Sequence, residues 1–126
     1  MKDAATVLVV DDDEDCRLIY GAALRAAGYH VLLAPNGALG VDRAVEHHPS
    51  VILLDIAMPI VDGRAALQSL RADQSTRDIP VVAITAMESM HNRGDLERAG
   101  FDAVLLKPLE PKLVVTAVRQ LLDAAP

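Results

Sequence analysis

The sequence predicts a single α/β domain in which helices cover both faces of a five-stranded parallel sheet. Five short apolar runs recur along the 126 residues, and each is rich in Val, Ile or Leu at successive positions. Runs without polar alternation are typical of strands buried on both faces, as in parallel sheets. The stretches between the runs have helical spacing, and regular alternation of strand and helix favours parallel pairing.

The first half of the chain shows this alternation twice. Residues 7–10 form the first expected strand, and the helix that follows has an apolar stripe closed by Gly28 at the position of a C-terminal cap. The stripe consists of Cys16, Ile19, Tyr20, Ala23 and Ala27. Residues 31–34 form the second strand, and residues 38–48 form a helix that Pro49 stops.

The second half adds three expected strands, at residues 51–54, 81–84 and 103–106. Asp62 is expected to cap a helix that runs to about Ala72. A polar loop then leads to Pro80, which is acceptable as the first residue of a strand. A weaker helix is expected at about 88–99, ending at Gly100. The last helix has the clearest stripe, which follows Pro111 and contains Leu113, Val114, Ala117, Val118, Leu121 and Leu122.

Five strands with right-handed crossovers favour the flavodoxin-like strand order 2-1-3-4-5, with five helices on both faces. In this order the direction of winding reverses between the first and third strands. Ligands of doubly wound sheets bind beyond the carboxyl ends of the strands, next to that point. The fold class therefore predicts where a functional site lies, and residues 1–126 are expected to form one domain without an output domain.

Composition argues against several classes of protein. The net charge of −6 disfavours nonspecific binding to nucleic acid, and two Tyr, one Phe and no Trp give no platform for stacking bases. One Cys cannot form an internal disulfide or a Cys-based zinc site. No apolar run approaches the ~18 residues that cross a bilayer, and the first apolar run lacks the features of a signal peptide. We therefore expect a cytoplasmic protein that binds neither nucleic acid nor membrane.

Acidic residues gather where the first and third strands end. Five of the eighteen acids lie at residues 11–15, and Asp11 and Asp12 follow the first strand directly, as Asp55 follows the third. Two carboxylates at ~4 Å repel each other by ~4 kcal/mol at an effective dielectric constant near 20. Such a cluster must protonate or attract a cation. Oxygen ligands without His or Cys suit Mg²⁺ or Mn²⁺.

The fourth and fifth strands end at groups that suit a phosphoryl ligand. Thr85 supplies a hydroxyl and Lys107 an ammonium group. An Asp can accept a phosphoryl group as an acyl phosphate when a metal ion and a Lys neutralise the charge. The chain has no Walker-type loop and no GxGxxG motif, so the phosphoryl donor is expected to be another molecule.

Five motifs in this order resemble the receiver domain of response regulators over nearly the whole chain. Val-Leu-Val-Val precedes Asp11-Asp12, and Ile-Leu-Leu precedes Asp55. The remaining motifs are Met58-Pro59 with Asp62-Gly63, Ile84-Thr85-Ala86, and Leu106-Lys107-Pro108. Each motif alone is weak, but their order and their positions at the ends of strands are specific.

The resemblance implies a role for each candidate residue. Asp55 would be the phosphoacceptor and Asp12 the principal metal-ligating acid, with Asp11 acting largely through water. The backbone carbonyl of Ala57 would be a further ligand to Mg²⁺ or Mn²⁺. Thr85 would bond one phosphoryl oxygen and Lys107 would pair with another. The family also implies a cis peptide between Lys107 and Pro108.

The resemblance also implies a signalling switch rather than an enzyme, whose only intrinsic activities would be autophosphotransfer and slow autodephosphorylation. The donor would be a histidine kinase or a histidine phosphotransfer protein, docking on the first helix and the loop after Lys107. A downstream protein would be the target. The face formed by the fourth helix, fifth strand and fifth helix would change shape. The protein would be a monomer, or a weak dimer formed through that face.

One departure from the family concerns how a partner protein would detect the phosphorylation state. Many members have Tyr or Phe three residues before the Lys, where this chain has Val104. Three alternatives stay open. The chain could be a receiver cut from a hybrid kinase, or a binding module that acts independently of phosphate. It could also be a small Mg²⁺-dependent phosphatase of the haloacid dehalogenase type, with Asp11 as nucleophile and Asp13 as acid/base.

Overall fold

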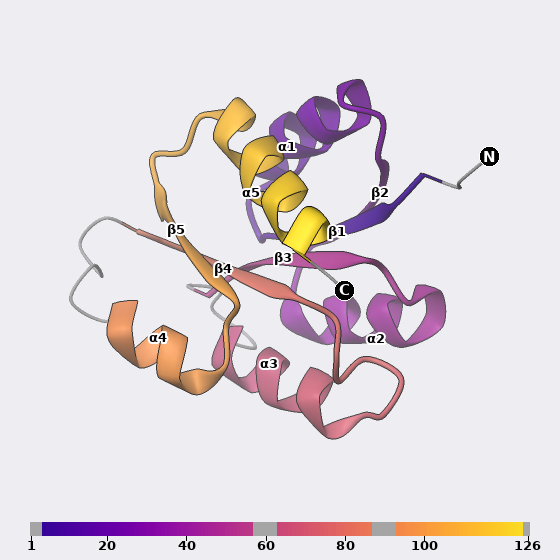
Figure 1. Ribbon diagram of the computed structural model, residues 1–126, viewed down its shortest axis with the longest axis vertical. Helices are drawn as coiled ribbons and strands as arrows, with labels where there is room; N and C mark the ends of the chain where they lie inside the picture. The colour runs from indigo at the N-terminus through magenta and orange to yellow at the C-terminus, as the bar shows by residue number, and fades with distance from the viewer. Residues whose placement is uncertain (1–3, 57–62, 87–92, 125–126) are drawn as a thin grey trace.

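Strands and helices alternate along the chain in a computed structural model that describes residues 4–56, 63–86 and 93–124 (Figure 1). The strands are β1 (Thr6–Val10), β2 (His30–Ala34), β3 (Val51–Asp55), β4 (Val81–Ala86) and β5 (Ala103–Lys107). The helices are α1 (Glu14–Ala26), α2 (Gly37–His47), α3 (Gly63–Ala72), α4 (Arg93–Ala99) and α5 (Pro111–Ala124).

The five strands form one parallel sheet in the order β2-β1-β3-β4-β5, as the sequence predicted. The strands extend one or two residues past the predicted apolar runs, because main-chain pairing continues beyond them. Thr85, expected just after β4, therefore lies within it. Pro80 lies just before β4, and its carbonyl accepts a hydrogen bond from the Ile52 amide at 3.0 Å.

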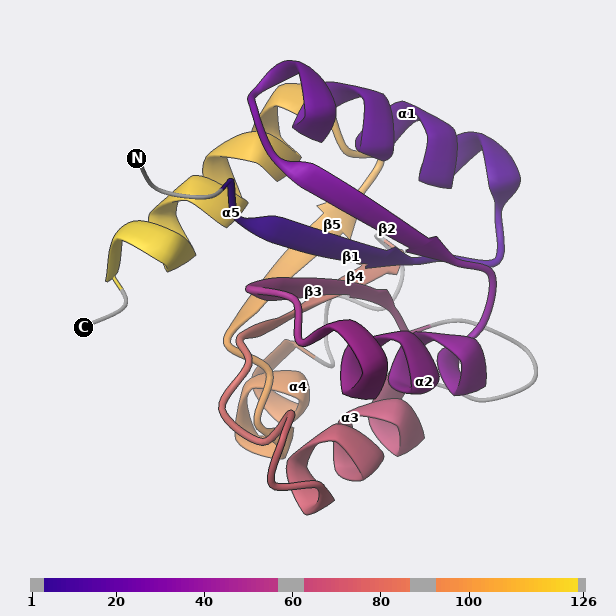
Figure 2. The ribbon, with the colours of Figure 1, turned by 90° about the vertical axis from the view of Figure 1, so that its right-hand side faces the viewer.

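Helices cover the sheet on both faces (Figure 2). α1 and α5 lie on one face, and α2, α3 and α4 lie on the other. Alternate residues of β1 serve the two sides, with Val7 and Val9 packing toward α1 and α5 and Leu8 and Val10 packing toward the other three helices. β3 is buried along its whole length, which explains its continuous apolar sequence.

The ends of the first two helices follow local sequence signals. Asp13 is the N-cap of α1, where its carboxylate accepts hydrogen bonds from the Asp15 and Cys16 amides. Gly28 follows this helix with φ +98°, in the left-handed conformation that the sequence predicted for a C-terminal glycine. Asn36 caps α2, which ends before the left-handed residue His48. The predicted cap Asp62 and the expected helical residues 88–92 lie outside the described residues.

A close approach between the end of β3 and the start of α3 requires a glycine. A Cβ on Gly63 would lie 2.5 Å from Cγ2 and 2.6 Å from Cα of Ile56. The Gly63 amide also donates to the Ile56 carbonyl at 3.4 Å. The absent side chain therefore lets α3 begin directly beside the carboxyl end of β3.

Arg71, near the end of α3, connects segments at the opposite edge of the sheet. Its Nη1 donates to the carbonyls of Arg77 and Ile79 at 3.0 and 2.7 Å. Its Nη2 donates to the Gly100 carbonyl at 3.2 Å and pairs with Asp102 at 3.0 Å. The Asp102 carboxylate accepts in turn from the Val81 amide, so one guanidinium joins the segments that precede β4 and β5.

Among the helices of the described residues, none is long and apolar enough to cross a membrane.

Candidate functional site

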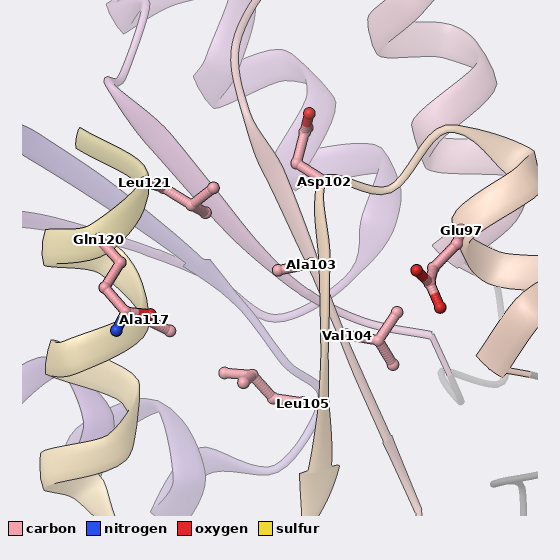
Figure 3. Close-up of a pocket in the computed structure, with 8 residues that line it drawn as sticks. All are labelled: Glu97, Asp102, Ala103, Val104, Leu105, Ala117, Gln120 and Leu121. Carbon is pink, nitrogen blue, oxygen red and sulfur yellow. The ribbon is translucent and has the colours of Figure 1, made fainter. Parts of the chain in front are cut away.

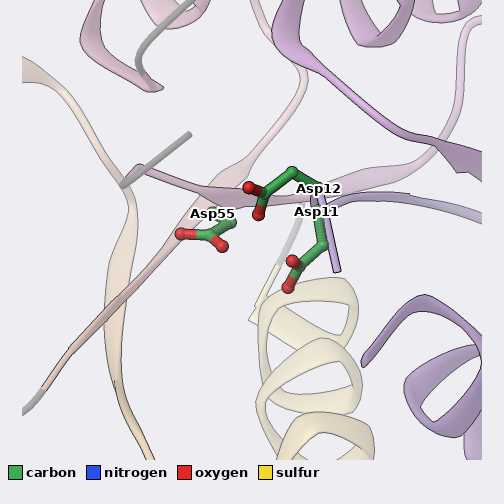
Figure 4. A group of neighbouring side chains, drawn as sticks. All are labelled: Asp11, Asp12 and Asp55. Carbon is green, nitrogen blue, oxygen red and sulfur yellow. The ribbon is translucent and has the colours of Figure 1, made fainter. Parts of the chain in front are cut away.

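Three carboxylates meet at the carboxyl ends of β1 and β3, where the sequence predicted them (Figure 4). Asp11 and Asp12 directly follow β1, and Asp55 is the last residue of β3. One oxygen of each carboxylate lies within 4.8 Å of one from each of the others. Asp11 and Asp55 are only 1% and 4% exposed, whereas Asp12 is exposed to solvent. The cluster is therefore open to solvent on the side of Asp12.

Lys107 brings a positive charge into this cluster from β5. Its Nζ lies 3.3 Å from Oδ2 of Asp11 and 3.2 Å from Oδ2 of Asp55. Burial alone lowers the pKa of Lys107, but the negative charges of Asp55 and Asp11 outweigh burial and raise it. Lys107 therefore stays protonated and bridges the two buried carboxylates.

The ammonium group of Lys107 does not fully offset the effect of burial on Asp11. Burial raises the pKa of Asp11 from 3.8 to about 6, and the charge of Asp55 adds to that effect. The hydrogen bond from the Asp13 amide and the charge of Lys107 act in the opposite direction. The ionised form of Asp11 is thus disfavoured in the metal-free fold, and a divalent cation would stabilise it.

The connection between β1 and α1 is held by several hydrogen bonds. The Asp13 amide donates to Oδ1 of Asp11 at 2.9 Å, while Asp13 uses its own carboxylate to cap α1. Nη1 of Arg17 donates to the Asp11 carbonyl at 2.6 Å. Arg17 was not among the site residues expected from the sequence. The available signal was a basic residue two positions after the acidic run.

Thr85 lies in β4, on the strand next to Asp55. Its neighbour Ile84 is in register with Asp55, so Thr85 lies one residue farther along the adjacent strand. Thr85 is buried. The peptide between Lys107 and Pro108 is cis, as the resemblance implied. Ala57, whose carbonyl was expected to bind the metal, lies outside the described residues.

The donor set fits a hard divalent cation. All three clustered side chains are carboxylates, and Mg²⁺ prefers oxygen ligands and keeps several of its waters. Asp12 is exposed, so solvent water reaches this side of the cluster. Asp13, the acid/base of the phosphatase alternative, is instead engaged in capping α1, so that alternative has no support from the geometry.

Cys16 and Tyr20 pack beneath this site, in the core between the sheet and α1 with α5. Burial raises the pKa of Tyr20 to about 12, and Cys16, one helical turn earlier, adds to the effect. Burial likewise raises the pKa of the Cys16 thiol. Both side chains therefore stay neutral near pH 7, and Cys16 packs as the small apolar residue that the sequence predicted.

Comparison with known proteins identifies relatives over almost the whole chain. The family model of the response regulator receiver domain matches residues 7–119. The polar-differentiation response regulator DivK of Brucella ovis is 32% identical over 120 residues, which cover 94% of this chain and 98% of DivK. The DNA-binding transcriptional regulator RpaA of Synechocystis is 36% identical over 116 residues, which cover 92% of this chain and 48% of RpaA.

Solved structures show the same fold. A putative response regulator from Chloroflexus aurantiacus matches with a TM-score of 0.88 at 28% identity, covering 95% of this chain and 98% of that one. The receiver domain of a sensor histidine kinase from Pseudomonas aeruginosa, solved with a magnesium ion in its active-site cleft, has a TM-score of 0.86 at 27% identity. That match covers 96% of this chain and 99% of the other. The chain therefore belongs to the response regulator receiver domain family of two-component signalling.

Proposed function

We propose that this receiver accepts a phosphoryl group on Asp55 from a histidine kinase or a histidine phosphotransfer protein, in a Mg²⁺-dependent reaction. The observation that carries the proposal is the position of Lys107 Nζ, which lies within 3.3 Å of both Asp11 and Asp55. A phosphoryl group on Asp55 would meet this ammonium and the cation site together. Phosphorylation would then switch the binding of a downstream protein.

A dianionic phosphoryl group can approach the buried acids only where positive charge offsets the repulsion between them. A carboxylate oxygen of Asp55 attacks phosphorus in line, and the bond from phosphorus to the donor imidazole breaks, with its electron pair returning to the imidazole nitrogen. Lys107 pairs with one phosphoryl oxygen and Thr85 donates to another. Bound Mg²⁺ would neutralise charge on the phosphoryl oxygens, held by Asp12, Asp55 and the Ala57 carbonyl, with Asp11 acting through water.

The donor protein would dock beside the site on α1. Leu18 and Ile19 are neighbours on the first half of α1, and they are 50% and 51% exposed, the highest values among the large apolar side chains of the described residues. Pro108, directly after Lys107, is also exposed. These residues would form an apolar contact that brings a phosphohistidine over Asp55.

The phosphorylation state would be read on the face formed by α4, β5 and α5. A cavity of about 390 Å³ lies there beside β5, lined among others by Glu97 of α4, Val104 of β5 and Gln120 of α5 (Figure 3). Val104 is only 6% exposed and packs into the core, so no aromatic ring marks the state of the site at this position. Phosphorylation would instead displace the segments around this cavity. The protein would be a monomer, or a weak dimer formed through the same face.

Residues 1–126 would form one receiver unit that acts in the cytoplasm. Partner binding that is unchanged by Asp55→Asn would favour the alternative of a module that acts independently of phosphate. The alternative that this receiver is part of a hybrid kinase stays open, because a similar receiver domain belongs to a sensor histidine kinase.

Intact-mass measurement tests the phosphoacceptor directly. The protein would be incubated with acetyl phosphate and MgCl₂, and the expected product carries one additional phosphoryl group. Asp55→Asn should abolish the adduct, as should chelation of the metal. Asp123→Asn makes the same charge change on the exposed end of α5 and should retain it. An adduct that persists in Asp55→Asn would refute the assignment.

A further inference from the structure

Each polar atom of Asp11 is held by a partner. Its amide donates to the Ala34 carbonyl at 3.1 Å, and its Oδ1 accepts from the Asp13 amide at 2.9 Å. Its Oδ2 lies 3.3 Å from Lys107 Nζ, and its carbonyl accepts from Arg17 Nη1 at 2.6 Å. The residue that follows β1 is therefore fixed on all sides.

Asp12 differs from its neighbour. Its side chain is exposed, and within residues 4–56, 63–86 and 93–124 the structure gives it no hydrogen bond or ion pair. Its carboxylate nevertheless lies with those of Asp11 and Asp55 (Figure 4). Because no hydrogen bond or ion pair of the described residues directs the Asp12 side chain, the backbone on either side of it sets where its carboxylate points.

Arg17 acts on that backbone. Its amide donates to the Asp13 carbonyl at 3.1 Å, so its main chain is fixed within α1. Its guanidinium reaches back to the carbonyl of Asp11, the group that forms the peptide bond with Asp12. A charge-assisted hydrogen bond is about twice as strong as a neutral one, and this one spans the whole connection from β1 to α1.

We propose that Arg17 is a positioning residue for the cation site, which holds the peptide between Asp11 and Asp12 so that the Asp12 carboxylate faces the other two acids. The inference rests on the proposed function, since it takes Mg²⁺ as the ion bound there. Arg17 contacts a main-chain oxygen and not the ion. Partners that orient metal ligands in this way typically contribute ten- to a hundredfold to metal affinity.

The sign of the effect separates positioning from simple charge. Arg17 is a cation close to a cation site, so its removal would tighten Mg²⁺ binding if only its charge mattered. Loss of positioning would weaken binding instead. The two explanations therefore predict changes of opposite direction in the same measurement.

Isothermal titration calorimetry with MgCl₂ makes the comparison. We expect the dissociation constant of Arg17→Ala to rise about tenfold, and Arg17→Lys, which keeps a donor, to recover part of the loss. Arg25→Ala is the matched control, because Arg25 lies in the last turn of the same helix and its removal changes the net charge equally. Its dissociation constant should stay the same or fall slightly.

Arg17→Met, which keeps the length but has no donor, provides a second test if the alanine variant does not fold. Thermal melts without Mg²⁺ identify which variants are folded. Unchanged or tighter binding in the folded variants would overturn the positioning role. Failure of the wild-type protein to bind Mg²⁺ would instead overturn the metal site on which the proposed function rests.

Discussion

Replacement of Asp11 by Asn is expected to stabilise the metal-free protein while it impairs the cation site. Asp11 is 1% exposed, and its pKa in the fold is about 6 rather than 3.8. A raised pKa of an acid means that the folded protein disfavours the ionised form. Asn removes that charge and keeps an oxygen that can accept from the Asp13 amide.

The magnitude follows from the shift in pKa. One pKa unit corresponds to about 1.4 kcal/mol, so ionised Asp11 disfavours the fold by roughly 3 kcal/mol near pH 7.5. The Asn side chain no longer attracts Lys107, which reduces the gain. We therefore expect a rise of about 1–3 kcal/mol in the free energy of unfolding.

The dependence on pH has a definite sign. The folded protein binds the Asp11 proton more tightly than the unfolded chain does, because the pKa in the fold is the higher one. The contribution of Asp11 to stability therefore improves as the pH falls through about 6 toward 3.8, and is least favourable above that range. Asp11→Asn should lack this part of the pH dependence.

Urea denaturation in EDTA, followed by circular dichroism between pH 5 and 8, measures both quantities. Asp123→Asn controls for net charge and should change the free energy of unfolding by less than about 0.5 kcal/mol. A variant of Asp11 that is no more stable than the wild type at pH 7.5, with an unchanged pH dependence, would refute the electrostatic argument.

Three further substitutions test other parts of the structure. Arg71→Ala should lower the free energy of unfolding by about 2–4 kcal/mol in urea denaturation, because four acceptors lose one donor group. Replacement of the exposed Arg77 by Ala should change it little. A loss under about 1 kcal/mol in Arg71→Ala would contradict the stabilising role of the Arg71 contacts. Gly63→Ala should lower the free energy of unfolding by about 1–3 kcal/mol in the same assay, because its Cβ would clash with Ile56. In Gly94→Ala the added Cβ meets only the flexible Arg98 guanidinium, so this control should not be destabilised. Equal effects of the two substitutions would contradict the close approach between Gly63 and Ile56. Lys107→Met should slow phosphorylation by acetyl phosphate about a hundredfold, followed by intact mass, and an unchanged rate would exclude a role in charge stabilisation.

The sheet and the site were predictable from the sequence because both depend on short local patterns. Strands buried on both faces need continuous apolar runs, and the parallel order then brings Asp11, Asp12 and Asp55 to one edge. Lys107 was expected there for the same reason, at the end of β5. In each case the position of a residue relative to the end of a strand was sufficient.

Other features depend on side-chain reach, which a sequence pattern does not contain. The contact of Arg17 with the Asp11 carbonyl requires a guanidinium to extend back over the start of α1. The contacts of Arg71 join segments far apart in the chain. The raised pKa of Asp11 needs both its burial and its distance from Asp55 and Lys107, which only the fold supplies.

A crystal structure determined with Mn²⁺ tests the central claim most directly, since anomalous scattering identifies the ion. We expect one anomalous peak between the carboxylates of Asp11, Asp12 and Asp55. Crystals of Asp55→Asn grown with a low, subsaturating concentration of Mn²⁺ should show no such peak. Crystals of the wild-type protein with no peak there at saturating Mn²⁺, or with the three carboxylates turned away from one another, would contradict it.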